Sequence, residues 1–96
     1  MSKHKNIKSL LRKLTTLTVY HAEKIVSTEH QLEKEIIPLL KNSSTKSELY
    51  KEILAKAMEL NILATASVMQ SMHTKLATSI QIESLQRELQ ELGGQL

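Results

Sequence analysis

Hydrophobic residues recur at intervals of three and four along most of this chain, the spacing that places side chains on one side of an α-helix. The first stripe consists of Ile7, Leu10, Leu11, Leu14, Leu17, His21, Ile25, Leu32, Ile36 and Leu39. It predicts a helix from about residue 5 to residue 37 or 41. Pro38 lacks a backbone donor and crowds the carbonyl of Lys34, so we expect the helix to kink or end there.

A second helical pattern runs from residue 46 to about residue 92, after a turn at residues 42–45. Thr45 and Glu48 have the spacing of a capping box. In that arrangement the threonine hydroxyl accepts from a free amide of the first turn, and the glutamate accepts from the threonine amide. We therefore expect the second helix to begin near Lys46.

The second helix is apolar or small around much of its circumference between Ile53 and Met72, and such a helix needs neighbours on more than one side. The pattern from Ile82 to Leu92 is typical of a short coiled-coil end. The fold class predicted is all-α: an antiparallel hairpin of two long helices in one domain, residues 1–96, assembling into a helical bundle. A break within residues 73–79, where Thr and Ser lower helix propensity, would give three helices.

A hairpin of two such helices is too long to cover both of its own flanks. Each large aliphatic side chain left in water forgoes about 1.5 to 3 kcal/mol. We therefore expect a second polypeptide, either another copy in a homodimer or a protein with a helical surface, to cover the second helix. The expected partner-binding residues are Ile53, Ala57, Leu60, Ala64, Val68, Met69, Met72 and Leu76. The alternative is a bent three-helix monomer that buries these residues itself.

The amino-acid composition argues against several kinds of functional site. The chain has sixteen Leu and eight Ile but two Tyr and no Phe or Trp, which argues against a ligand cleft or a base-stacking surface. The absence of Cys excludes thiolate metal sites and thiol nucleophiles. No apolar run approaches the roughly 20 residues that span a bilayer. We expect a cytoplasmic protein without a transmembrane segment.

Candidate metal and catalytic motifs are missing from the sequence. A di-metal site in a bundle uses Glu-x-x-His. The residues three positions before His21, His30 and His73 are Thr18, Ser27 and Gln70. The chain has no His-x-x-x-His and no Asp. We expect no catalytic residue, metal or cofactor, and no enzymatic activity. His21 and His73 are expected in the core or at its boundary, with a pH-sensitive role for His21 as the alternative.

The strongest charge signal is a basic arm at the N-terminus. It consists of Lys3, Lys5, Lys8, Arg12 and Lys13, and no acid occurs before Glu23. In an antiparallel hairpin the arm would lie beside Glu83, Glu88 and Glu91, so internal ion pairing is expected. The alternatives are binding to nucleic-acid phosphates or to an anionic membrane, and a likeness to organelle transit peptides.

In general shape, a cysteine-free helical hairpin of this size with an exposed aliphatic face resembles the small bacterial chaperones and adaptors that hold secreted helical subunits, type III secretion chaperones among them. This resemblance implies a client helix held against the region from Ile53 to Leu76. The function expected is therefore a non-enzymatic protein-interaction module. The alternative is a small dimeric nucleic-acid-binding protein that uses the basic arm.

Overall fold

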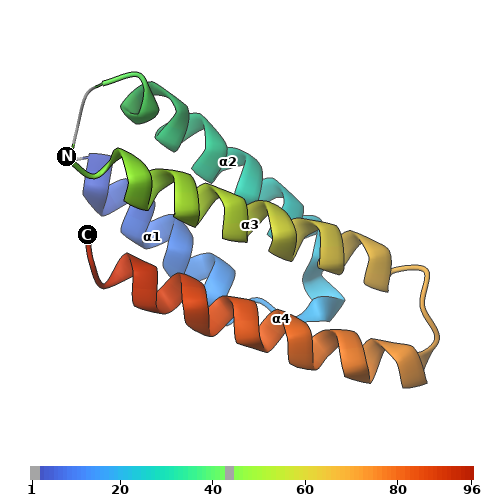
Figure 1. The fold of residues 1–96 in the computed structure, drawn as a ribbon. Coiled ribbons are helices and arrows are strands. Elements are labelled where there is room, and N and C mark those ends of the chain that lie inside the picture. The colour runs from blue at the N-terminus through green and yellow to red at the C-terminus, as the bar shows by residue number, and fades with distance from the viewer. Residues whose placement is uncertain (1–2, 43–44) are drawn as a thin grey trace.

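The computed structural model describes residues 3–42 and 45–96. These residues form four α-helices and one short 3₁₀ helix, and the described ranges contain no strand (Figure 1). The elements are α1 (Lys3–Thr16), η1 (Val19–His21), α2 (Ala22–Leu40), α3 (Ser47–Ser67) and α4 (Met72–Gly93). The predicted all-α class is confirmed, but each of the two long helices expected from the sequence is divided.

The first division follows Thr16, within a stretch that contains the β-branched residues Thr15, Thr16, Thr18 and Val19. Thr15 Oγ1 donates to the carbonyl of Arg12 at 2.9 Å, and Thr16 Oγ1 donates to the same carbonyl at 3.1 Å. Threonine hydroxyls that bond nearby carbonyls offer the backbone an alternative to helix continuation. Thr18 then adopts an extended conformation, which ends the helical path before η1.

A buried glutamine of α4 supports this ending. Gln86 Nε2 donates to the carbonyl of Leu14 at 2.9 Å and also to the carbonyl of Leu17. The last carbonyls of a helix have no partner within it. The amide of Gln86 therefore takes the place of the backbone donors that a longer α1 would have supplied.

The second division lies at residues 68–71, earlier than the break considered at residues 73–79, which are helical. Ser71 is the N-cap of α4: its backbone is extended and its Oγ accepts from the amide of Thr74 at 3.4 Å. A serine cap of this kind stabilises a new helix start. The chain therefore turns before Met72 and returns antiparallel to α3.

The expected capping box at the start of the second helix is not formed. Lys46 occupies the N-cap position of α3, no side chain caps it, and Glu48 lies 3.4 Å from Lys51 Nζ instead. Of the expected turn at residues 42–45, residues 43 and 44 lie outside the described part. The helix does not end at Pro38, because α2 continues to Leu40. Pro38 lies in the last turn, where its missing N–H removes only one backbone hydrogen bond.

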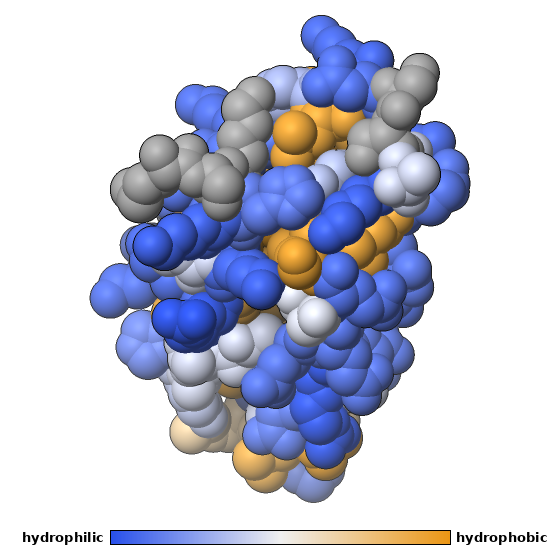
Figure 2. Space-filling view, turned by 90° about the vertical axis from the view of Figure 1, so that its left-hand side faces the viewer, coloured by the Kyte–Doolittle hydropathy of each residue, from blue (hydrophilic) through white to orange (hydrophobic). Residues whose placement is uncertain are grey.

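The four helices form a bundle of 45 × 20 × 20 Å, in which α1 and α3 each pack against both α2 and α4. The start of α1 and the C-terminus lie at one end and the α3–α4 turn at the other (Figure 1). The end with the C-terminus is mostly hydrophilic, with hydrophobic side chains visible between polar ones (Figure 2). The fully buried core includes Ile7, Leu14, Ile25, Leu32, Ile36, Ile53, Leu60, Ile82 and Leu89. One chain therefore builds the core that the sequence was expected to share with a second polypeptide.

Candidate functional site

The structure separates the expected partner-binding residues into a buried and an exposed group. The buried group is Ile53, Ala57, Leu60 and Ala64, all fully enclosed in the core. The prediction is corrected for these four, because α2 and α4 of the same chain cover that side of α3. The exposed group is Val68, Met69, Met72 and Leu76. These four remain accessible at the end of the bundle that carries the α3–α4 turn.

Two residues that were not expected extend the exposed group. The Tyr20 hydroxyl lies 3.7 Å from the Met72 sulfur, and Ile80 follows Leu76 by one helical turn. We call the whole set the apolar surface; its members are Tyr20, Val68, Met69, Met72, Leu76 and Ile80. Met69 is 90% exposed, and the other five are each more than half exposed. The four-residue spacing of Met72, Leu76 and Ile80 was the signal that could have revealed this stripe.

The stripe of Met72, Leu76 and Ile80 lies on the outward side of α4, and this part of α4 extends beyond the end of α1. Gln86 of α4 lies opposite the end of α1, where it bonds the carbonyls of Leu14 and Leu17. From Gln86 back to Met72, α4 continues for about 20 Å at 1.5 Å per residue. Only the short η1 segment accompanies it on that side, and α3 and α4 extend beyond α1 in Figure 1.

The basic arm lies along α1. Lys5, Lys8, Arg12 and Lys13 are exposed, whereas the side chain of Lys3 lies outside the described part. The expected ion pairs with α4 are not formed by Lys8, Arg12 or Lys13: within residues 3–42 and 45–96, none of the three has a carboxylate partner. The physical reason is that Glu88 turns toward α3, where it pairs with Lys56.

Two shallow hollows flank α1, and neither is lined by a carboxylate. The hollow between α1 and α4 has a volume of about 220 Å³ and is lined by Lys8, Leu11, Arg12, Thr15, Gln90 and Gly93. A Cβ atom on Gly93 would lie 3.1 Å from Leu11 Cδ1, so the glycine lets α4 approach α1 closely. The hollow between α1 and α2, about 280 Å³, contains Lys13 and Lys24 among neutral side chains. The surface around α1 is therefore locally positive.

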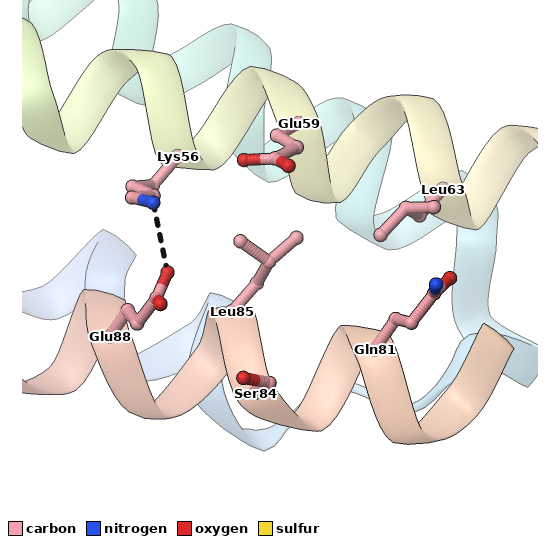
Figure 3. A pocket seen from close by; sticks show the side chains of 7 residues that line it. All are labelled: Lys56, Glu59, Leu63, Gln81, Ser84, Leu85 and Glu88. Carbon is pink, nitrogen blue, oxygen red and sulfur yellow. Dashed lines mark ion pairs between the residues drawn. The ribbon is translucent and has the colours of Figure 1, made fainter. Parts of the chain in front are cut away.

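The groove between α3 and α4 is lined by one lysine and two glutamates, together with neutral side chains (Figure 3). Lys56 Nζ lies 3.0 Å from Glu88 Oε2 across it, while Leu63 and Leu85 form its apolar part. The hydrogen-bonding contact with Glu88, and then its negative charge, raise the pKa of Lys56 above the ordinary 10.5. The lysine is therefore a positively charged partner of Glu88 at neutral pH.

One group of side chains on α2 has metal-ligating atoms close together. Atoms of Glu29, His30 and Glu33 lie within 4.8 Å of one another, and His30 Nδ1 is 3.8 Å from Glu33. However, Glu29 Oε2 already accepts a hydrogen bond from Asn61 at 2.9 Å. Three donors from two neighbouring turns of one helix leave much of a metal's coordination sphere to solvent. The grouping does not support a metal-binding function.

The two singled-out histidines lie on the surface, so the expectation of core or boundary positions is corrected. His21 is exposed in η1, and its Nδ1 lies 2.8 Å from Thr18 Oγ1. Its position on the first stripe placed it inside only if the helix continued through residue 21, which it does not. His73 is exposed in the first turn of α4, beside the apolar surface.

No protein-family model, curated protein or solved structure matches this chain. Among the described residues, none of the helices has the length and apolar character required to cross a bilayer.

Proposed function

We propose that this chain is a non-enzymatic protein-interaction module that holds a helical segment of another protein, in the manner of a small chaperone or adaptor. The observation that carries the proposal is the apolar surface. A domain with a complete core of its own gains nothing in folding from six large apolar side chains in water. Contiguous exposed apolar residues of this kind mark interaction sites.

The size of the apolar surface supports this function. From the exposed fractions of its six residues, it presents roughly 700 Å² to solvent, close to the roughly 800 Å² that each partner buries in a stable complex. Two of its members are Met69 and Met72, whose unbranched, flexible side chains adapt to the shape of a partner. The surface therefore has both the area and the plasticity that helix capture requires.

Site-specific photo-crosslinking in the native cells tests the proposal. Benzoylphenylalanine in place of Met69 is expected to give a discrete protein adduct, whereas the same group in place of Glu52, exposed on α3 and outside the apolar surface, is expected to give none. The absence of an adduct from Met69 in a folded chain would contradict the proposal. The mass of the adduct also distinguishes a second copy from a different protein.

A second candidate is polyanion binding by a dimer, and it is favoured by the unpaired Lys8, Arg12 and Lys13 around α1. Binding to phosphates weakens steeply as salt rises, because bound counterions are released. Binding through the apolar surface changes little with salt. A titration with a DNA duplex at two ionic strengths therefore separates the two functions.

A further inference from the structure

Resting on the proposed function, we propose that the partner is an acidic amphipathic helix, and that it lies lengthwise on the face formed by α1 and α4. The inference starts from one continuous exposed stripe on α4. Its members are Met72, Leu76, Ile80, Glu83, Arg87 and Gln90, at spacings of four, four, three, four and three. This spacing keeps all six on one side of the helix over about 27 Å.

The stripe changes character along its length. Its first half, from Met72 to Ile80, is apolar and belongs to the apolar surface. Its second half is polar and ends at Gln90, which lines the hollow that contains Lys8 and Arg12 of α1. The face therefore offers apolar anchors at one end and cations at the other, and a single helix of about 18 residues would span both.

The charge on this face calls for an acidic partner. Lys8, Arg12 and Arg87 contribute three cations, and among the described residues no carboxylate pairs with any of them. Glu83 is the acid on the stripe, and Glu91 is exposed one helical turn after Arg87. At the apolar end Lys75 adds a further cation, whose Nζ lies 5.8 Å from the ring centre of Tyr20. A partner with carboxylates beside its apolar stripe would meet Lys75 at one end of the face and Lys8 and Arg12 at the other.

A second copy of this chain fits the face less well. Two α4 stripes packed in parallel would place Arg87 against Arg87, and antiparallel packing would place Arg87 near the apolar Met72 end. Neither arrangement supplies carboxylates for Lys8 and Arg12. Nucleic acid would satisfy the cations but leave Leu76 and Ile80 in water. An acidic amphipathic helix satisfies both halves of the face.

Two synthetic peptides of about 18 residues test the inference with the full-length chain. Both carry the same leucine stripe; one has Glu and the other Lys at the flanking positions. Measured by fluorescence anisotropy, the Glu peptide is expected to bind about tenfold more tightly than the Lys peptide. Equal binding of the two peptides, or tighter binding of the Lys peptide, would overturn the inference.

Matched substitutions locate the binding face. Ile80→Ser is expected to weaken binding of the Glu peptide about tenfold, since a buried aliphatic anchor is lost. Ile62→Ser is the control, because Ile62 lies on α3 with the same exposure, 67% against 66%. Lys8→Glu should remove most of the preference for the Glu peptide, and Lys34→Glu, an exposed lysine on α2, should leave it intact. Equal effects of test and control variants would overturn the inference.

Two further probes cover the other classes of ligand. A DNA duplex or vesicles with anionic lipid that bind more tightly than the Glu peptide would overturn the inference.

Failure of this inference can be distinguished from failure of the proposed function. If Met69 still cross-links to a protein while the Glu peptide does not bind, the interaction module stands and the acidic helix does not. If the Glu peptide binds but Met69 gives no adduct in cells, the helix-binding chemistry stands and the cellular function does not.

Discussion

Leu60 and Leu76 are the same residue type in two environments, one in the core and one on the apolar surface. Replacing each by alanine therefore distinguishes a contribution to folding from a contribution to binding. Leu60 is completely buried in α3, whereas Leu76 in α4 is 63% exposed. Leu60→Ala removes a core side chain and leaves a cavity, which costs about 2 to 5 kcal/mol. A small domain has a total stability of only about 5 to 15 kcal/mol, so this variant is expected to be severely destabilised.

Leu76→Ala removes a side chain that is mostly in water already. About a third of its side chain is covered, so the lost transfer free energy is at most about 1 kcal/mol at 0.8 kcal/mol per buried methylene. Alanine also has a slightly higher helix propensity than leucine, which offsets part of the loss. The free energies of unfolding of the two variants should therefore differ by at least about 1 to 2 kcal/mol.

Urea denaturation followed by circular dichroism measures both values. If Leu76→Ala proves as destabilising as Leu60→Ala, the apolar surface is part of the folded core and the reasoning fails. Binding should rank the variants in the opposite order. Leu76→Ala is expected to lose partner capture while remaining folded, and Leu60→Ala should retain it at temperatures where its helical signal persists.

Three further predictions concern contacts within the bundle. Gln86→Leu is expected to lower the free energy of unfolding by about 1 to 3 kcal/mol, because two carbonyls at the end of α1 lose their donor; an unchanged urea midpoint would contradict this role. Ser71→Ala should lower the free energy of unfolding by about 1 kcal/mol, because the cap of α4 is lost. Thr45→Ala should change it by less than about 0.5 kcal/mol. A larger effect of Thr45→Ala than of Ser71→Ala would instead indicate a capping box at Thr45. Because Glu88 raises the pKa of Lys56, their pair stabilises the fold from neutral pH up to pH 10.5 and loses this effect as pH rises through the raised value. Above neutral pH, the stability difference between Lys56→Gln and the parent chain should therefore shrink only in strongly alkaline solution, as thermal unfolding at several pH values would show.

The helical class and most of the core followed from hydrophobic spacing alone, because every buried stripe obeys the helical period. The divisions of the two long helices did not. The run Thr15, Thr16, Thr18 and Val19 carried a signal in its β-branched residues and hydroxyls, but whether it breaks a helix depends on a buried donor from Gln86, about seventy positions away in sequence. Helix propensity describes one segment and contains no information about such a partner.

The candidate site was predicted in part for a related reason. The sequence identified Val68, Met69, Met72 and Leu76, but it placed them on the same uncovered flank as Leu60 and its neighbours. The chain turns back at Ser71, so α4 packs over the apolar stripe of α3 and buries it. The residues in and next to the turn stay exposed to solvent. Tyr20 was missed because it joins the apolar surface only through η1.

Oxidative footprinting of the methionines tests the central claim, that the apolar surface is covered by a protein partner. In the purified chain Met69 and Met72, which are 90% and 68% exposed, should oxidise readily, and Met58 at 45% provides an internal reference on the outer side of α3. In the native cells, mass spectrometry should find Met69 and Met72 protected several-fold relative to Met58. The same ratios of oxidation in cells and in the purified chain would contradict the account.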